Sequence, residues 1–118
     1  MLNIFGGNAA KRFTAADAVA LAAKGEITLL DVREAAEIAA SGTAQGAVNI
    51  PVAMVPLKAN PNGPDCDKRL TTAKPIAVFC AVGGRAGMAQ QALERMGYTA
   101  HNIGGFTDWV NAGGPVQR

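Results

Sequence analysis

The residues of this sequence that could do chemistry gather in a short loop that follows an apolar run. Cys80 ends the run Pro75–Cys80, and the loop after it carries two glycines and then Arg85. Gly83 and Gly84 permit positive φ angles, which let successive backbone N–H groups turn inward and form a nest for an anion. The predicted helix after the loop adds its first N–H groups and the positive end of its dipole. Because this field stabilises the thiolate, the loop predicts a reactive cysteine.

Arg85 adds a permanent positive charge to the same loop. Its guanidinium can make forked hydrogen bonds to an oxyanion, so the spacing supplies a nucleophile and a receptor for an anionic substrate together. A simpler interpretation is that Cys80 is a small buried apolar residue and that the glycines only make a tight turn. The combination of thiol, glycine pair, arginine and helix start favours the catalytic interpretation.

Other kinds of site do not fit the spacing. A phosphate-binding Walker loop ends in GK[ST], which "GGRAG" lacks, and there is no G-x-G-x-x-G after a strand. The single histidine, His101, lies in a different segment from Cys66 and from Cys80, so we expect no metal site and no Cys–His pair. We interpret His101 as an ordinary strand residue, and we expect no cofactor.

Size and charge restrict the class of protein. With 118 residues, 49% of them hydrophobic and 17% charged, the chain is predicted to form one domain over residues 1–118. Its net charge of +2 comes from interspersed acids and bases, which excludes nucleic acid as an expected partner. No apolar stretch approaches the ~20 residues of a membrane span, and no leader is evident. We therefore expect a cytoplasmic protein without membrane contact, whose two cysteines are free thiols.

Short apolar runs alternate along the chain with helical patterns. Strands are expected at Ile27–Val32, Ala47–Pro51, Pro75–Cys80 and Thr99–Ile103. Helices are expected at Phe13–Gly25 (with Thr14 as N-cap), Glu34–Gly42, Arg85–Gly97 and Phe106–Gly114. A helical turn is expected at Val52–Ala59, and an irregular segment at Asn60–Lys74. Alternation of this kind predicts an α/β fold with a central, mainly parallel sheet flanked by helices on both faces. Ligands of such sheets bind beyond the carboxyl ends of strands, where Asp31, Arg33 and Cys80 are expected.

Several stretches together resemble a single-domain rhodanese, a family of thiosulfate sulfurtransferase-like proteins. They are "LLDVREAAEI", "GAVNIP", "VFCAVGGRA", "ALERMGY" and "NIGGFTDWVNAGGPV", which cover about residues 12–116. The C-x-x-G-x-R loop, the D-V-R-E strand end and the G-G-F-x-x-W segment make the resemblance specific.

The resemblance implies a role for each matching residue. Cys80 accepts sulfane sulfur as a persulfide, and the persulfide and the substrate anion are cradled by Ala81, Val82, Gly83, Gly84 and Arg85. Asp31 and Arg33 brace the pocket, and we expect a buried Arg33 to pair with an acid such as Glu37. Gly104 and Gly105 are expected to form a turn that lets Trp109 pack.

The sequence departs from the family pattern at two positions. The usual serine after the loop arginine is Ala86, and the usual histidine of "G-H-I-x-G-A" is missing from "SGTAQGA", in which Thr43 occurs. Neither change removes the nucleophile. We expect the first to affect the rate or the choice of acceptor and the second to affect packing of the pocket.

These observations predict a sulfurtransferase that moves sulfur from a small anionic donor such as thiosulfate to a thiophilic acceptor. Cyanide or a thiol, including a thiol on a protein, can be that acceptor. A cysteine phosphatase or arsenate reductase is an alternative, although its C-x5-R loop is one residue longer than the loop here. A non-catalytic binding module is the other alternative. Cys66 is expected to be dispensable, and the alternative is a resolving thiol that attacks the persulfide.

Overall fold

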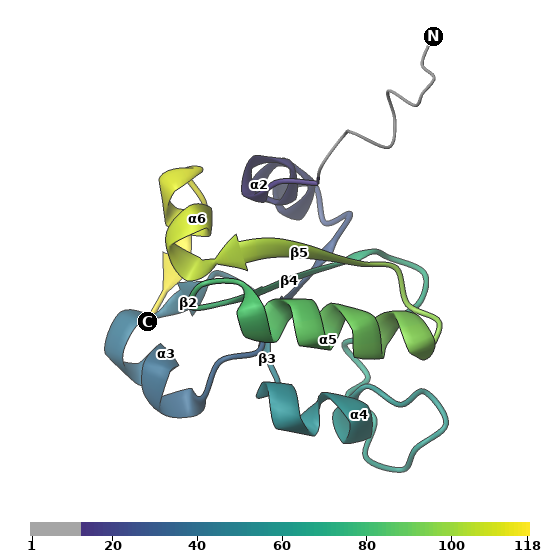
Figure 1. The fold of residues 1–118 in the computed structure, drawn as a ribbon. Helices are drawn as coiled ribbons and strands as arrows, with labels where there is room; N and C mark the ends of the chain where they lie inside the picture. The colour runs from purple at the N-terminus through teal and green to yellow at the C-terminus, as the bar shows by residue number, and fades with distance from the viewer. Residues whose placement is uncertain (1–12) are drawn as a thin grey trace, which may run out of the picture.

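Four parallel strands form the central sheet, in the order β3-β1-β4-β5. The computed structural model describes residues 13–118 (Figure 1). The strands are β1 (Thr28–Asp31), β3 (Val48–Asn49), β4 (Ile76–Cys80) and β5 (Ala100–Gly105). Every residue of β4 is buried, which is why its sequence is a continuous apolar run. The predicted α/β fold with a parallel sheet is confirmed, and the first twelve residues of the predicted domain lie outside the described ones.

Helices cover both faces of this sheet. They are α2 (Ala15–Ala23), α3 (Ala35–Ser41), the 3-10 turn η1 (Val52–Met54), α4 (Val55–Lys58), α5 (Gly84–Arg95) and α6 (Phe106–Asn111). In Figure 1, α2 and α6 lie on one side of β5, and α5 and α4 lie on the other.

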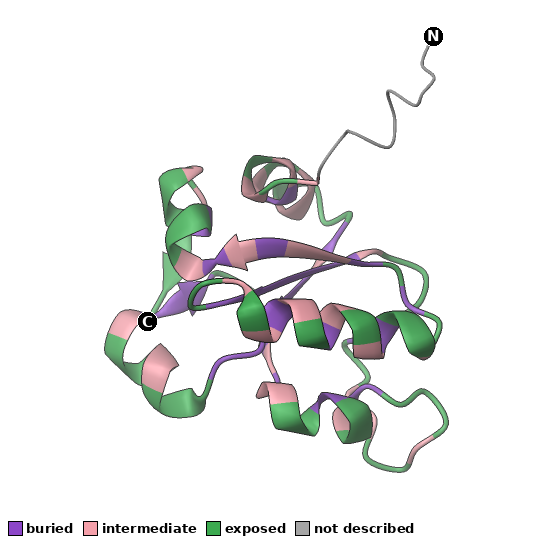
Figure 2. Ribbon diagram, viewed as in Figure 1, coloured by how far each residue is buried: buried purple, intermediate pink, exposed green. Residues whose placement is uncertain are grey.

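The core has two parts, because neighbouring residues of a strand point to opposite faces. Leu30 and Val78 pack toward α5, whereas Leu29 and Phe79 pack toward α2 and α6, where Trp109 is fully buried. The buried stretches of the sheet run between the two layers (Figure 2). Cys80 belongs to the part of the core that faces α5.

The ends of the helices follow the signals in the sequence. The Thr14 hydroxyl accepts from the backbone N–H of Asp17 at 3.2 Å, and the Asp17 carboxylate accepts from the N–H of Thr14 at 2.8 Å. Gly25 ends α2 with a φ of 70°. The prediction for α5 needs one change: Met88 is 64% exposed, because the buried stripe of that helix runs through Ala89 and Leu93.

A second, two-stranded antiparallel sheet was not predicted. It pairs β2 (Thr43–Ala44) with β6 (Val116–Gln117), so the end of the chain crosses the segment that follows α3. Strands of two residues have no periodicity that a sequence pattern could reveal. This small sheet holds Thr43 close to the end of β1.

The segment from Asn60 to Lys74 consists of turns, as predicted. Its residue Leu70 reaches the core, and Cys66 is partly buried. None of the helices within residues 13–118 combines the length and the apolar character of a membrane span.

Candidate functional site

Cys80 is the last residue of β4, and its sulfur lies inside the loop that follows. The backbone N–H of Gly83 donates to Cys80 Sγ at 2.9 Å, and the N–H of Ala86 donates at 3.4 Å. Cys80 is 1% exposed. Of the predicted cradle residues, Gly83 directs its N–H at the sulfur, and Ala86, which was not selected as a cradle residue, adds its backbone N–H although it lacks the usual serine hydroxyl. Two N–H dipoles directed at one sulfur stabilise negative charge on it.

Of the two loop glycines, Gly83 is the one with a positive φ, at 103°. This conformation points its N–H at Cys80 and is unfavourable for any other residue. Gly84 is the first residue of α5 and has no positive φ, and a side chain there would meet nothing within 4 Å. The expectation that both glycines turn the chain is therefore wrong for Gly84.

Gly104, at the end of β5, makes the predicted turn with a φ of 93°, whereas Gly105 has a different role from the predicted one. A side chain at Gly105 would overlap the carbonyl oxygen of Ala81, so glycine lets β5 approach the cysteine loop. The glycine whose absent side chain leaves room for the Trp109 ring is Gly114. Gly105 thus belongs to the support of the loop, and the tryptophan packs through a later turn.

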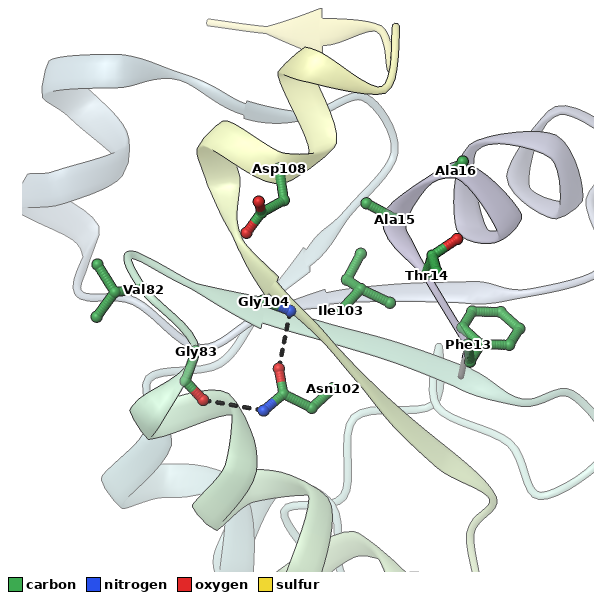
Figure 3. A pocket seen from close by; sticks show the side chains of 10 residues that line it. All are labelled: Phe13, Thr14, Ala15, Ala16, Val82, Gly83, Asn102, Ile103, Gly104 and Asp108. Atoms are coloured by element: carbon green, nitrogen blue, oxygen red, sulfur yellow. Dashed lines mark hydrogen bonds between the residues drawn. The ribbon is translucent and has the colours of Figure 1, made fainter. Parts of the chain in front are cut away.

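Asn102 is a site residue that the sequence analysis missed. Its side-chain amide donates to the carbonyl of Gly83 at 3.0 Å, and its side-chain oxygen accepts from the N–H of Gly104 at 2.8 Å (Figure 3). The side chain thereby ties the cysteine loop to the end of β5 and orients the Gly83 peptide. The available signal was an asparagine inside a strand, where this residue type is uncommon.

A cavity of about 630 Å³ lies against the outer side of the loop. Val82, Gly83 and Asn102 line one wall, and Thr14 lines another (Figure 3). Cys80 is not among its lining residues, because the sulfur faces the inside of the loop. Val82 is 90% exposed at the tip of the loop, so the loop separates this cavity from the Cys80 sulfur.

Asp31 and Arg33 form a buried pair at the end of β1. The Arg33 side chain donates to the Asp31 carboxylate from Nε at 3.1 Å and from Nη2 at 2.8 Å. It also donates to the Ser41 hydroxyl and to the Gly42 carbonyl. The guanidinium carbon lies 4.6 Å from the centre of the Phe106 ring. Each polar atom of the pair has a partner, which is what a buried ion pair requires.

Thr43 completes the surroundings of Asp31. Its hydroxyl donates to Asp31 Oδ2 at 2.7 Å, and it is buried. The departure from the family pattern at this position therefore supplies a hydrogen bond to the strand-end carboxylate. Asn49, which the sequence analysis did not select, donates its side-chain amide to the backbone carbonyls of Asp31 and Arg33, each at 3.0 Å.

Arg85 binds Glu37, which lies 48 residues earlier on α3. Arg85 Nη1 donates to Glu37 Oε1 at 2.6 Å, and Nη2 donates to Oε2 at 2.9 Å. The expected partnership between Arg33 and Glu37 is wrong: the acid that pairs with Arg33 is Asp31. The two side chains of the Arg85–Glu37 pair are 32% and 35% exposed, so the pair lies at the surface of the site.

The hydrogen bonds between Arg85 and Glu37 shift the pKa values of both side chains. The hydrogen bonds from Arg85, with help from the backbone N–H of Glu34, lower the pKa of Glu37 to about 2. The hydrogen bonds to Glu37 raise the pKa of Arg85, and negative charge at Cys80 acts in the same direction to a smaller extent. Both shifts therefore stabilise the charged forms of the two side chains.

The remaining candidate residues lie elsewhere. Both cysteines are free, and Cys66 Sγ donates to the backbone carbonyl of Asp67 at 3.7 Å in the turn segment. Burial, together with the neighbouring Cys66, raises the pKa of Tyr98. His101 lies on β5 as predicted, and its ring stacks on Phe13 at 4.1 Å. Within residues 13–118, no group of three or more histidine, cysteine or acidic side chains is placed to hold a metal ion.

Comparison with protein families gives a direct assignment. The family model described as the rhodanese-like domain matches residues 14–112, which include every strand of the central sheet and the whole cysteine loop. The chain belongs to the rhodanese-like family. No curated protein shows a significant match to the sequence.

Solved structures support this assignment. The human single-domain sulfurtransferase TSTD1 is 32% identical, with a TM-score of 0.71 over 86% of this chain and 96% of that one. A rhodanese-related protein from Thermoplasma volcanium is 30% identical, with a TM-score of 0.72 over 91% and 97%. A Rhodopseudomonas palustris protein of unknown function, described as a possible tyrosine phosphatase, is 27% identical, with a TM-score of 0.79 over 99% and 98%. This rhodanese-like chain therefore has relatives with different suggested activities.

Proposed function

We propose that this rhodanese-like protein is a sulfurtransferase that carries sulfane sulfur on Cys80. The observation that supports the proposal most is the pair of backbone N–H groups, from Gly83 and Ala86, that donate to Cys80 Sγ. The same groups can stabilise the anionic persulfide that follows, which is the electrostatic part of catalysis. The positive end of the α5 dipole contributes in the same direction.

The first half of the reaction is a nucleophilic displacement. The Cys80 thiolate attacks the terminal sulfur of thiosulfate, a bond forms between the two sulfurs, and the sulfur–sulfur bond of thiosulfate breaks. Sulfite leaves with that electron pair, and Cys80 carries a persulfide anion. Arg85 and the loop residues Ala81, Val82 and Gly84 surround the donor in this proposal.

In the second half, the acceptor attacks the outer sulfur of the persulfide. With cyanide, a carbon–sulfur bond forms, thiocyanate leaves, and the electron pair of the broken bond returns to the Cys80 thiolate. A thiol acceptor removes the same sulfur as a new persulfide. Neither half requires a cofactor or a metal, and a free thiol on Cys80 suits the reducing cytoplasm that we propose as its location.

The loop argues against phosphatase chemistry. Four residues separate Cys80 from Arg85, whereas the phosphatase loop has five. Cys80 is 1% exposed, and its sulfur already accepts two N–H groups, so we expect this short loop to suit one additional sulfur better than a tetrahedral phosphate. A binding module without activity would not need a thiol in this cradle.

Intact mass spectrometry after incubation with thiosulfate tests the proposal. We expect a gain of one sulfur atom on wild-type protein and on the Cys66→Ser variant, and its loss after addition of cyanide. Cys80→Ser should show no gain and no thiocyanate formation, because its hydroxyl stays protonated at neutral pH. Circular dichroism of both variants checks the fold.

The other outcomes separate the alternatives. No sulfur on the wild type, with hydrolysis of an aryl phosphate, would support the phosphatase. No adduct and no turnover with any donor would support the binding module. A Cys66–Cys80 disulfide after donor treatment would support the resolving role of Cys66.

A further inference from the structure

Arg85 is not free to receive a substrate anion in this structure. Both of its terminal nitrogens donate to Glu37, at 2.6 and 2.9 Å, so the fork that would hold an oxyanion already holds a carboxylate. Any donor that uses this guanidinium must therefore replace hydrogen bonds from a side chain that cannot diffuse away.

No other charge near the loop replaces Arg85 as an attraction for an anionic donor. Arg33 is buried and its charge is matched by Asp31. Glu34 comes three residues before Glu37, and its negative charge also raises the pKa of Arg85. Among the described residues from Cys80 to Gly87, Arg85 is the one cation. A doubly charged donor thus approaches two carboxylates, and its attraction comes mainly from backbone N–H groups.

Glu37 is also ionised at neutral pH. Arg85 and the N–H of Glu34 hold the pKa of Glu37 at about 2, so the carboxylate competes as an anion at every neutral pH. Roughly a third of each side chain is exposed, which allows the pair to open without exposing the core. The pair is consequently an exchangeable contact.

We propose that Glu37 is a specificity-determining residue, which competes with the donor for Arg85 and makes the site prefer a donor of lower charge over the thiosulfate dianion. The inference rests on the proposed sulfurtransferase function and narrows its substrate class. Donors that carry one negative charge, such as a thiosulfonate or the persulfide of a small thiol, lose less affinity for the site through the presence of the Glu37 carboxylate.

Two donors of similar shape test this inference. Thiosulfate carries two negative charges, whereas methanethiosulfonate has a methyl group in place of one charged oxygen and carries one. In each case the Cys80 thiolate takes the terminal sulfur, and sulfite or methanesulfinate leaves with the electron pair. Steady-state kcat/KM for thiocyanate formation is measured for both donors, with the persulfide detected by mass.

Glu37→Gln is the informative variant. Its amide oxygen can still accept the N–H of Glu34, which donates to Glu37 Oε1 at 2.9 Å in the wild type, so the start of α3 is preserved. We expect kcat/KM for thiosulfate to rise about ten-fold, mainly through a lower KM, and kcat/KM for methanethiosulfonate to rise less than about three-fold.

Two controls test whether Glu37 acts through its hydrogen bonds to Arg85. Glu34→Gln removes a similar charge without removing a hydrogen bond to Arg85, and it should change the ratio of the two donors by less than about two-fold. In Arg85→Ala, the further change Glu37→Gln should have no additional effect on the ratio, because Glu37 acts through Arg85.

Each remaining outcome counts against the inference. If Glu37→Gln lowers kcat/KM for both donors equally, Glu37 only holds Arg85 in place. If Glu34→Gln shifts the ratio as much as Glu37→Gln, the effect is general charge and not competition for the guanidinium. If wild-type protein forms a persulfide with both donors and the ratio is the same in all variants, only the inference fails. If neither donor loads Cys80, the proposed function fails, and the inference fails with it.

Discussion

Two arginine–carboxylate pairs flank the site, and they differ in burial, in the number of their partners and in the sequence separation of their residues. The Asp31–Arg33 pair is buried, its arginine is 4% exposed, and neighbouring groups satisfy the remaining polar atoms. The Arg85–Glu37 pair is about one-third exposed and consists of two hydrogen bonds between two side chains. The first pair joins residues two positions apart, and the second joins residues 48 positions apart.

This difference in exposure indicates that the arginines of the two pairs have different roles. A buried pair with a complete set of partners cannot release its arginine to a substrate without leaving a charged group unpaired in the core. A pair at the surface loses little when it opens, because water replaces the lost contacts. We therefore infer that Arg33 positions the end of β1, whereas Arg85 is available to the donor after exchange with Glu37.

The largest expected effect comes from breaking the buried pair. Arg33→Met leaves Asp31, which is fully buried, with an uncompensated charge, and should lower the free energy of unfolding by about 3–5 kcal/mol. The double variant Asp31→Asn with Arg33→Met should recover part of this loss, because no buried charge remains. Urea denaturation of the three proteins measures both values. Equal stability of wild type and Arg33→Met would contradict the assignment of Arg33 to the support.

Thr43→Val sharpens the description of the same pair. The substitution keeps the shape of the side chain and removes the donor that lies 2.7 Å from Asp31 Oδ2. A hydrogen bond to a buried carboxylate contributes about 2 kcal/mol, and we expect a loss of that size in urea denaturation. Thr99→Val is the matched control, since Thr99 is exposed and its substitution should change stability by less than about 0.5 kcal/mol.

Arg85→Ala tests the exposed pair by activity. We expect kcat/KM for thiosulfate to fall about ten-fold, because a charge-assisted contact to the donor is lost while the N–H groups of Gly83 and Ala86 remain. Its Tm should change less than that of Thr43→Val. Arg69→Ala is the control: Arg69 forms a similar pair with Asp67 in the turn segment, at 2.7 Å. Unchanged kinetics in Arg85→Ala would show that backbone N–H groups alone bind the donor.

The smallest expected effect is on the pH dependence of stability. The pKa of Glu37 falls from 4.5 to about 2 in the folded protein, so the pair stabilises the fold at pH values above 4.5. This contribution is lost as the pH falls from 4.5 to about 2. Thermal melting should therefore show a difference in Tm between wild type and Glu37→Gln at pH 6 that shrinks toward pH 2. A constant difference across this range would mean that Glu37 stabilises the fold by packing.

The elements of the fold were predictable where the local signal was strong. The continuous apolar run that ends at Cys80 indicated a buried strand, and Gly97 after an amphipathic stretch indicated the end of a helix. The prediction was less accurate for single side chains. Met88 fitted the apolar pattern of α5 and is nevertheless exposed, because a pattern shows which residues share a helix face but not how wide the covered stripe is.

In the site, too, features encoded by adjacent residues were predictable and contacts of single side chains were not. The position of the Cys80 thiol, the turn at Gly83 and the N–H groups of the helix start follow from a few adjacent residues, so spacing predicts them. Gly84 was assigned a turn that Gly83 makes by itself, because two adjacent glycines look alike in a sequence. The role of Asn102 was not predicted, since its two hydrogen bonds depend on β5 lying beside the cysteine loop.

The sequence by itself determined that a thiol follows a buried strand and precedes a helix, with an arginine five residues after it. These features are local, and the backbone conformations that create the cradle cost or gain free energy within a few residues. Only the tertiary structure decided which polar groups contact one another: Thr43 with Asp31, Glu37 with Arg85, and Asn102 with the carbonyl of Gly83. Hydrogen bonds act over about 3 Å, whereas the partners are separated by 12 to 48 residues along the chain, so packing of the sheet and its helices selects them.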